Sequence, residues 1–287
     1  RAHPLGICSP GFGLVVPPVY AAGNGARQFG TVSFRSGAFA RIGVPTPQVD
    51  GMAYDANRDV FWVCMTDRTL GTINPQDGVF TAVGLLTGST RPASGLAYDP
   101  YSDTLYGIVQ TGGRLVRIDL ATAAVTPVGG PGGNNIGALD YDSDTRTIFG
   151  IDDAASGSRL VRVDATTGAQ TPVGFLGAGI ADCNGLAYNP ADRQLYTINA
   201  GTEQLLRVDP ATGVASVVGP TGSLWGGNYG LACLGPPPCP TDFNRDGFVD
   251  FFDYDEFVAC FEAGVCPAGR TADFNRDGFV DFFDYDD

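Results

Sequence analysis

The residues best suited to chemistry in this sequence are oxygen-bearing side chains in two identical stretches near its C-terminus. Asp242 to Asp255 recurs without change from Asp273 to Asp286. In each copy, side-chain oxygens stand at loop positions 1, 3, 5, 9 and 12, glycine stands at position 6, and position 7 offers a backbone carbonyl. The ligands that this spacing predicts are Asp242, Asn244, Asp246, Phe248, Asp250 and Asp253 in the first loop, and Asp273, Asn275, Asp277, Phe279, Asp281 and Asp284 in the second.

Calcium is the cation that these loops would bind, because it takes about six to eight oxygen ligands at ~2.3–2.6 Å. Without a cation, the carboxylates of one loop would repel each other at close range. Residues 240–287 hold 13 acidic and 3 basic residues, a net charge of −10, against −4 for the preceding 239 residues. The alternative is a solvated acidic tail rich in turns. Two perfect copies favour two calcium sites.

A helical pattern follows the first loop: Phe251, Tyr254, Val258 and Phe261 recur at helical spacing. No segment of helical length precedes either loop. A loop followed by a helix, without the entering helix of an EF-hand, resembles the dockerin type I repeat, and the likeness covers about 48 residues. The resemblance implies a calcium-folded, non-catalytic module that binds a cohesin domain on another protein, with the ligands named above.

Loop positions 10 and 11 depart from the dockerin pattern. Cellulosomal dockerins often carry small or polar recognition residues there, whereas this sequence has Phe251-Phe252 and Phe282-Phe283. The paired aromatics favour packing on the chain's own body or on a neighbouring subunit. The second copy reaches Asp287 before a helix of its own, so we expect the natural chain to continue.

The rest of the chain is built from one motif in five copies. Ser94-Gly-Leu-Ala-Tyr-Asp-Pro100 has four relatives, and the central apolar residues of the five copies are spaced by 44, 43, 47 and 45 residues. Three further strand-like segments follow each of the first four copies. Four short strands every ~45 residues are typical of a β-propeller blade. The markers of the five copies are Met52, Leu96, Leu139, Leu186 and Leu231.

The two ends of the repeat region predict how the ring closes. Residues 16–43 supply only three strands, and Tyr229–Leu234 supplies the missing first strand of a fifth, composite blade. This Velcro closure would remove free sheet edges. The closing strand could instead come from a neighbouring molecule, but closure within one chain has the higher effective concentration. We therefore predict an all-β, five-bladed propeller over residues 1–234, a proline-rich linker over 235–240, and a dockerin-like calcium module over 241–287.

Composition narrows the partners and the compartment. All 17 basic residues are arginine and 31 residues are acidic, a net charge of −14, which argues against binding nucleic acid or anionic lipid. No apolar stretch is long enough to span a bilayer. Seven cysteines without a zinc-type pair favour disulfides and an oxidising compartment. We expect an extracellular or cell-surface protein whose secretion leader is absent from this chain. Cys8 and Cys233 are placed to lock the closing blade, and Cys260 to pair with Cys266 or Cys239.

Few residues suit catalysis. His3 is the only histidine and lysine is absent, which excludes histidine-activated nucleophiles, histidine-rich metal centres and Schiff-base chemistry. We expect the recurrent arginine–aspartate pairs to be salt bridges between blades, the recurrent acids that follow the motif to cap turns, and the recurrent tyrosines to pack. These sets are Arg117, Arg162 and Arg207 with Asp119, Asp164 and Asp209; Asp55, Asp99 and Asp142; and Tyr54, Tyr98, Tyr141 and Tyr188.

The sequence thus predicts a non-enzymatic, extracellular structural protein. Its calcium-loaded module would dock the propeller to copies of itself, in a fibre or surface layer, or to a cohesin-like partner. The rival hypothesis is an extracellular hydrolase or lyase acting on a polysaccharide or small ester, with the tail as its anchor. Such an enzyme would need several carboxylates in a deep axial pocket, whereas an assembly protein would have a filled or narrow axis.

Overall fold

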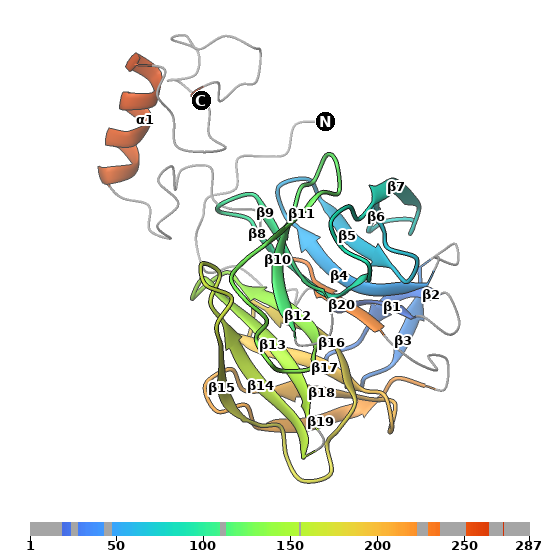
Figure 1. The fold of residues 1–287 in the computed structure, drawn as a ribbon. Helices are drawn as coiled ribbons and strands as arrows, with labels where there is room; N and C mark the ends of the chain where they lie inside the picture. Colours follow the sequence, from blue (N-terminus) through green and yellow to red (C-terminus); the bar gives the residue numbers. More distant parts are fainter. Residues whose placement is uncertain are drawn as a thin grey trace. The chain divides into compact units, whose positions relative to one another are not determined.

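The repeats fold into five antiparallel sheets of four strands each, which confirms the predicted five-bladed propeller (Figure 1). The computed structural model describes residues 19–23, 28–42, 48–109, 113–154, 156–222, 229–235, 251–263 and 272. Four blades are continuous in sequence. The first is β4 (Val49–Asp55), β5 (Val60–Met65), β6 (Thr69–Ile73) and β7 (Phe80–Leu85); the second is β8 (Ala93–Asp99), β9 (Thr104–Val109), β10 (Arg114–Ile118) and β11 (Val125–Pro127); the third is β12 (Ile136–Asp142), β13 (Thr147–Ala154), β14 (Gly157–Val163) and β15 (Gln170–Phe175); the fourth is β16 (Cys183–Asn189), β17 (Gln194–Asn199), β18 (Gln204–Val208) and β19 (Ala215–Pro220).

The fifth sheet combines strands from both ends of the propeller sequence. Its order is β20-β1-β2-β3, and we call it the composite blade. In it, β20 (Tyr229–Cys233) pairs with β1 (Val19–Gly23) in a five-residue antiparallel register that runs from Val19 opposite Cys233 to Gly23 opposite Tyr229. The sheet continues through β2 (Gln28–Val32) and β3 (Phe39–Arg41).

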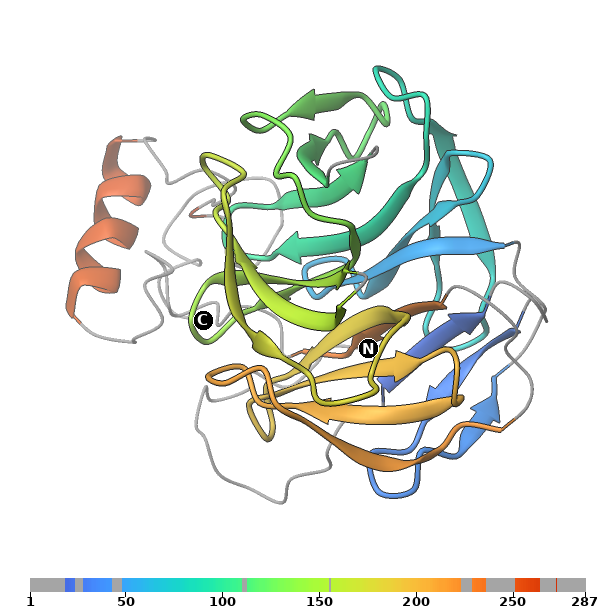
Figure 2. The same cartoon turned by 60° about the horizontal axis from the view of Figure 1, so that its bottom comes forward.

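The motif strand is the innermost strand of every blade. Each of β4, β8, β12, β16 and β20 contacts the inner strands of both neighbouring blades, so the five form a closed ring of contacts around the axis (Figure 2). Glycine in the motif permits this close approach. A Cβ on Gly95 would lie 2.6 Å from the backbone nitrogen of Leu139, and a Cβ on Gly230 would lie 2.6 Å from the Cβ of Met52, so larger residues would push the inner strands apart.

The turn between the third and fourth strands is the same in all five blades. Its fifth residue has a positive φ and donates its N–H to the carbonyl of its first residue, as in the bond from Gly168 to Asp164 at 2.8 Å. Glycine holds that position in four blades because it adopts a positive φ without steric cost, and Ala123 holds it in the second blade. The other positive-φ residues of this set are Gly37, Gly78 and Gly213.

Neighbouring blades meet where this turn of one blade rests on a glycine in, or just after, the fourth strand of the blade before it. A Cβ on Gly129, Gly174 or Gly219 would collide with the carbonyl oxygen of Thr167, Thr212 or Ser36 in the next blade. The joint from the fourth blade to the composite blade therefore has the same construction as the joints between continuous blades. The joint from the first to the second blade is looser, because a Cβ on Gly84 would lie 3.9 Å from the Cβ of Ala123.

The chain divides into two compact units. Residues 16–99 and 104–235 form one, and residues 1–15, 100–103 and 236–287 form the other. In the second unit, helix α1 (Phe251–Ala263) follows the first acidic loop, where the sequence predicts a helix. Within the described ranges, no helix is long and apolar enough to cross a bilayer.

Candidate functional site

The two predicted calcium loops lie almost wholly outside the described residues. Of the twelve proposed ligands, Asp253 alone falls in a described element, helix α1. Within the part of the chain that the structure describes, no group of three histidine, cysteine, aspartate or glutamate residues is arranged to hold a metal ion. His3 also lies outside the described residues. The calcium sites stay a prediction.

Helix α1 has one packed face and one exposed end. Cys260 is 1% exposed and packs with Ala272, and Phe257 and Phe261 cover this small cluster. Of the predicted apolar stripe, Phe261 belongs to this cluster. At the start of the helix, Phe251 and Phe252 are 67% and 66% exposed, so the aromatic pair singled out in the sequence lies on the surface of its own unit.

The cysteines of the propeller are not used as predicted. Cys64, Cys183 and Cys233 are buried free thiols, so the predicted lock between Cys8 and Cys233 is wrong. Burial raises the pKa of the Cys64 and Cys183 thiols to about 12, and a thiol in that state is a poor nucleophile. Cys260 is disulfide-bonded. Its partner lies outside the described residues, so the pairing with Cys266 or Cys239 stays a prediction.

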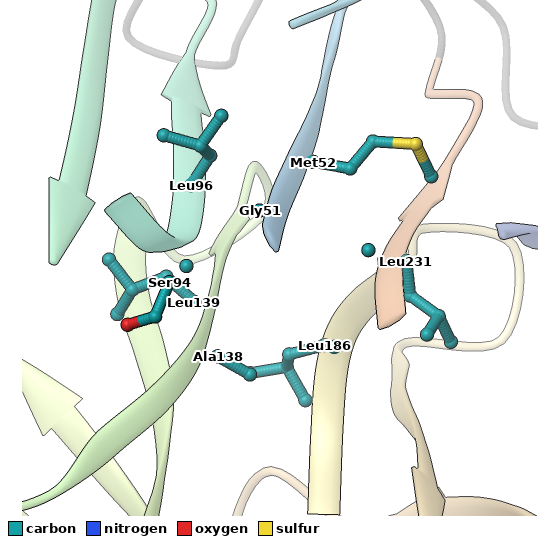
Figure 3. A pocket seen from close by; sticks show the side chains of 11 residues that line it. Gly51, Met52, Ser94, Leu96, Ala138, Leu139, Leu186 and Leu231 are labelled. Carbon is teal, nitrogen blue, oxygen red and sulfur yellow. The ribbon is translucent and has the colours of Figure 1, made fainter. Parts of the chain in front are cut away.

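The axis of the ring is narrow and apolar (Figure 3). Its cavity of about 10 Å³ is near the lower limit for a single water molecule. Among the described residues that line it, Ser94 has the one polar side chain, and its hydroxyl donates to the Ile136 carbonyl at 3.2 Å. None of these described residues carries a carboxylate. The large lining side chains are Met52, Leu96, Leu139, Leu186 and Leu231, which are also the residues that mark the sequence repeat.

The acids that end the motif strands cap turns, as predicted, at both positions where their hydrogen bonds are resolved. Oδ1 of Asp55 accepts the backbone N–H groups two and three residues later, at 2.9 and 3.0 Å. Oδ1 of Asp142 does the same at 2.9 and 3.1 Å. Asp55 also accepts the indole N–H of Trp62 at 2.9 Å. These carboxylates satisfy local backbone donors. For Asp99 the role stays a prediction.

The predicted salt bridges of the recurrent arginines do not form. In the described part of the chain, Arg117 lies over the ring of Tyr106 at 5.9 Å and Arg162 over that of Phe149 at 5.8 Å. Each ring is the cross-strand neighbour of its arginine within the same blade. The aspartates turn away because each accepts hydrogen bonds from its own turn: Asp119, Asp164 and Asp209.

The recurrent tyrosines pack, as predicted, and some also join neighbouring blades. Tyr98, Tyr141 and Tyr188 are less than 9% exposed. The hydroxyl of Tyr98 accepts the side-chain N–H of Asn57, in the preceding blade, at 2.7 Å. Tyr54 donates instead within its own blade, to Asp59 at 2.9 Å.

Asp140 is a buried acid that is not among the candidate residues predicted from the sequence. It is 8% exposed, and its Oδ2 accepts the backbone N–H of Tyr188 in the next blade at 2.5 Å. Burial raises the pKa of Asp140 to about 8. The motif itself marks this position as unusual, because the other four copies carry alanine where the third blade has Asp140.

Comparisons with known proteins place the chain at the level of fold. No protein-family model matches it, and no curated protein matches it. Among solved structures, it is similar to a chain of the crystal structure of a nidogen/laminin complex, with a TM-score of 0.53 and 15% identity over 76% of this chain and 82% of that one. TolB from Acinetobacter baumannii matches with a TM-score of 0.46 and 14% identity, over 71% of this chain and 53% of that one. At 15% identity, the likeness to the chain of the nidogen/laminin complex concerns the fold and no particular activity.

Proposed function

We propose that this chain is a non-enzymatic, extracellular assembly protein. The propeller is a rigid body, and the module of residues 241–287 binds two calcium ions and then docks that body to another subunit. The observation that carries the proposal is the unchanged repetition of a complete calcium-ligand pattern in two loops of one chain. In each loop, the cation would offset the mutual repulsion of four carboxylates.

The propeller suits the role of a scaffold. Its inner strands pack against each other around a cavity of about 10 Å³ lined by leucine, methionine, alanine, glycine and one serine, Ser94. An axial hydrolase or lyase would need converging carboxylates and room for a substrate, and nothing in this lining favours that rival function.

The composite blade is proposed to be a Velcro closure within one chain. Its pairing of β20 with β1 ties residues 229–233 to residues 19–23. Its turn rests on Gly219 of the fourth blade in the same way that the turns of other blades rest on Gly129 and Gly174. A ring closed in this way has no unpaired inner strand, which suits a subunit that bears load or repeats in an array.

The docking element is proposed to include the start of helix α1. Phe251 and Phe252 immediately follow position 9 of the first loop, so calcium bound in that loop would fix their orientation. Each is about two-thirds exposed, and paired aromatics of this kind are common anchors of protein interfaces. A second copy of this chain is the proposed partner. A cohesin-like protein is the alternative.

Light scattering and sedimentation of the full chain, in calcium and in chelator, test the proposal. We expect particles larger than one chain in calcium, and dissociation when the chelator removes it. The double variant Asp246→Ala/Asp277→Ala, which removes position 5 from both loops, should stay monomeric in calcium. The double variant Asp119→Ala/Asp164→Ala removes the same charge from exposed propeller turns and should assemble like the wild type.

Wild-type chain that stays monomeric in calcium would contradict self-assembly. If calorimetry then showed bound calcium, docking to a cohesin-like partner would be favoured. If calcium did not bind, the proposal as a whole would fail.

A further inference from the structure

The contact surface between the third and fourth blades, here called the 3–4 seam, contains a carboxyl group where the other seams contain methyl groups. In the inner strands, this position is occupied by alanines that are at most 1% exposed: Ala53, Ala97, Ala187 and Ala232. In the third blade it is Asp140, which is 8% exposed. A side chain that ionises has therefore replaced an inert one at a buried joint.

Asp140 belongs to a group of acids that hold one residue of the next blade. Its Oδ2 accepts the backbone N–H of Tyr188 at 2.5 Å. Burial and the nearby carboxyl groups of Asp142 and Asp144 raise the pKa of the Tyr188 hydroxyl. Asp144 also pairs with Arg193 of the fourth blade at 3.0 Å. Three carboxyl groups of the third blade thus meet a single tyrosine across the 3–4 seam.

The titratable groups around Asp140 do not favour its ionised form. Asp142 lies on the same strand, and Cys233, on β20, interacts with Asp140 and Asp192. Arg193 is a cation at this seam, but its side chain is 80% exposed and pairs with Asp144 and not with Asp140.

On the neighbouring strand β13, Phe149 lies opposite Asp140, and Arg162 lies over the ring of Phe149. Two backbone N–H groups stabilise the carboxylate, but burial outweighs them and raises the pKa of Asp140 to about 8.

We propose that Asp140 makes the 3–4 seam a proton-dependent latch: with its proton in place the two blades stay closed, and loss of that proton loosens them. The unfolded chain loses the same proton near pH 4. From about pH 4 to about pH 8 the folded chain therefore binds one more proton than the unfolded chain, and stability falls as pH rises. The ionisation of Asp140 alone therefore raises the unfolding equilibrium constant by up to about tenfold for each unit by which the pH increases in this range.

Equilibrium unfolding of the full chain at several pH values tests the latch. The unfolding constant of the wild type, divided by that of Asp140→Ala, should rise about 100-fold from pH 5 to pH 7. Alanine is the residue that the other blades already accommodate. Asp140→Asn, which keeps the size, should give the same trend. Asp164→Asn, in an exposed turn where hydrogen bonds lower the pKa of the carboxyl, should give a flat ratio. A flat ratio for both Asp140 variants would overturn the latch.

Two readouts on the unaltered protein complete the test. The carboxyl carbon of Asp140, followed by NMR, should titrate near pH 8, and a midpoint below pH 5 would overturn the proposal. Amide hydrogen exchange locates the effect. The protection of Tyr188 should fall above pH 8 while that of Tyr98, its equivalent at an alanine seam, persists. Equal behaviour of the two amides would place the effect elsewhere and contradict a latch at the 3–4 seam.

Discussion

Replacing Gly219 by alanine should weaken the joint between the fourth blade and the composite blade. The new Cβ would collide with the backbone carbonyl of Ser36, and it would lie 2.9 Å from the Ser36 carbonyl carbon. Both are main-chain atoms of a turn, so the turn must move as a unit. Overpacking of this kind costs about 2 kcal/mol, which corresponds to a fall of about 4–8 °C in Tm for a domain of this size.

Gly84→Ala is the matched control, because Gly84 holds the same position in the first blade. There the new Cβ would meet the Cβ of Ala123 at 3.9 Å, an ordinary van der Waals contact. Since alanine restricts the unfolded chain more than glycine does, this variant should be neutral or more stable by about 0.5 kcal/mol.

Thermal unfolding followed by circular dichroism measures both variants against the wild type. The joint model requires a lower Tm for Gly219→Ala alone. Equal losses in the two variants would show that glycine is needed for backbone conformation and not for contact between blades. No loss in either would refute the assigned joint.

Three further outcomes follow from the propeller. Cys64, Cys183 and Cys233 should resist a thiol reagent at pH 8 until the chain unfolds, because they are buried; rapid labelling of the native protein would contradict their burial. Asp55→Ala should lower the free energy of unfolding in chemical denaturation by about 3 kcal/mol, because the backbone N–H of Asn57 and the indole N–H of Trp62 would lose the carboxylate that accepts their hydrogen bonds. An unchanged denaturation midpoint would exclude that role. Hydrogen bonds from its own turn lower the pKa of Asp164, so the stability that its carboxylate contributes at neutral pH should be lost in acid. A difference in stability between the wild type and Asp164→Asn that persists below pH 3 would disprove this.

The blades could be predicted from sequence because each is a local unit. A 45-residue period, a strand motif and a turn glycine all act within one blade, and the cap at Asp55 reaches only three residues along the chain. The composite sheet was also predictable, because the period leaves one strand missing at one end and one spare at the other.

Contacts between blades were harder to predict, because they join residues far apart in sequence. Asp140 bonds a residue 48 positions later, and its environment depends on β16 and β20 together. Charge pairing alone does not predict the partners of the recurrent arginines, because cross-strand register places Arg117 over Tyr106. Sequence also does not distinguish the buried free thiol of Cys233 from one half of a disulfide that locks a closing strand.

Calcium-dependent docking is tested most directly by calorimetric titration of the full chain with calcium. The wild type should bind two ions per chain, Asp246→Ala or Asp277→Ala should each bind one, and the double variant should bind none. A wild-type chain that takes up no calcium, or a double variant that still binds two ions, would contradict the role given to the acidic repeats.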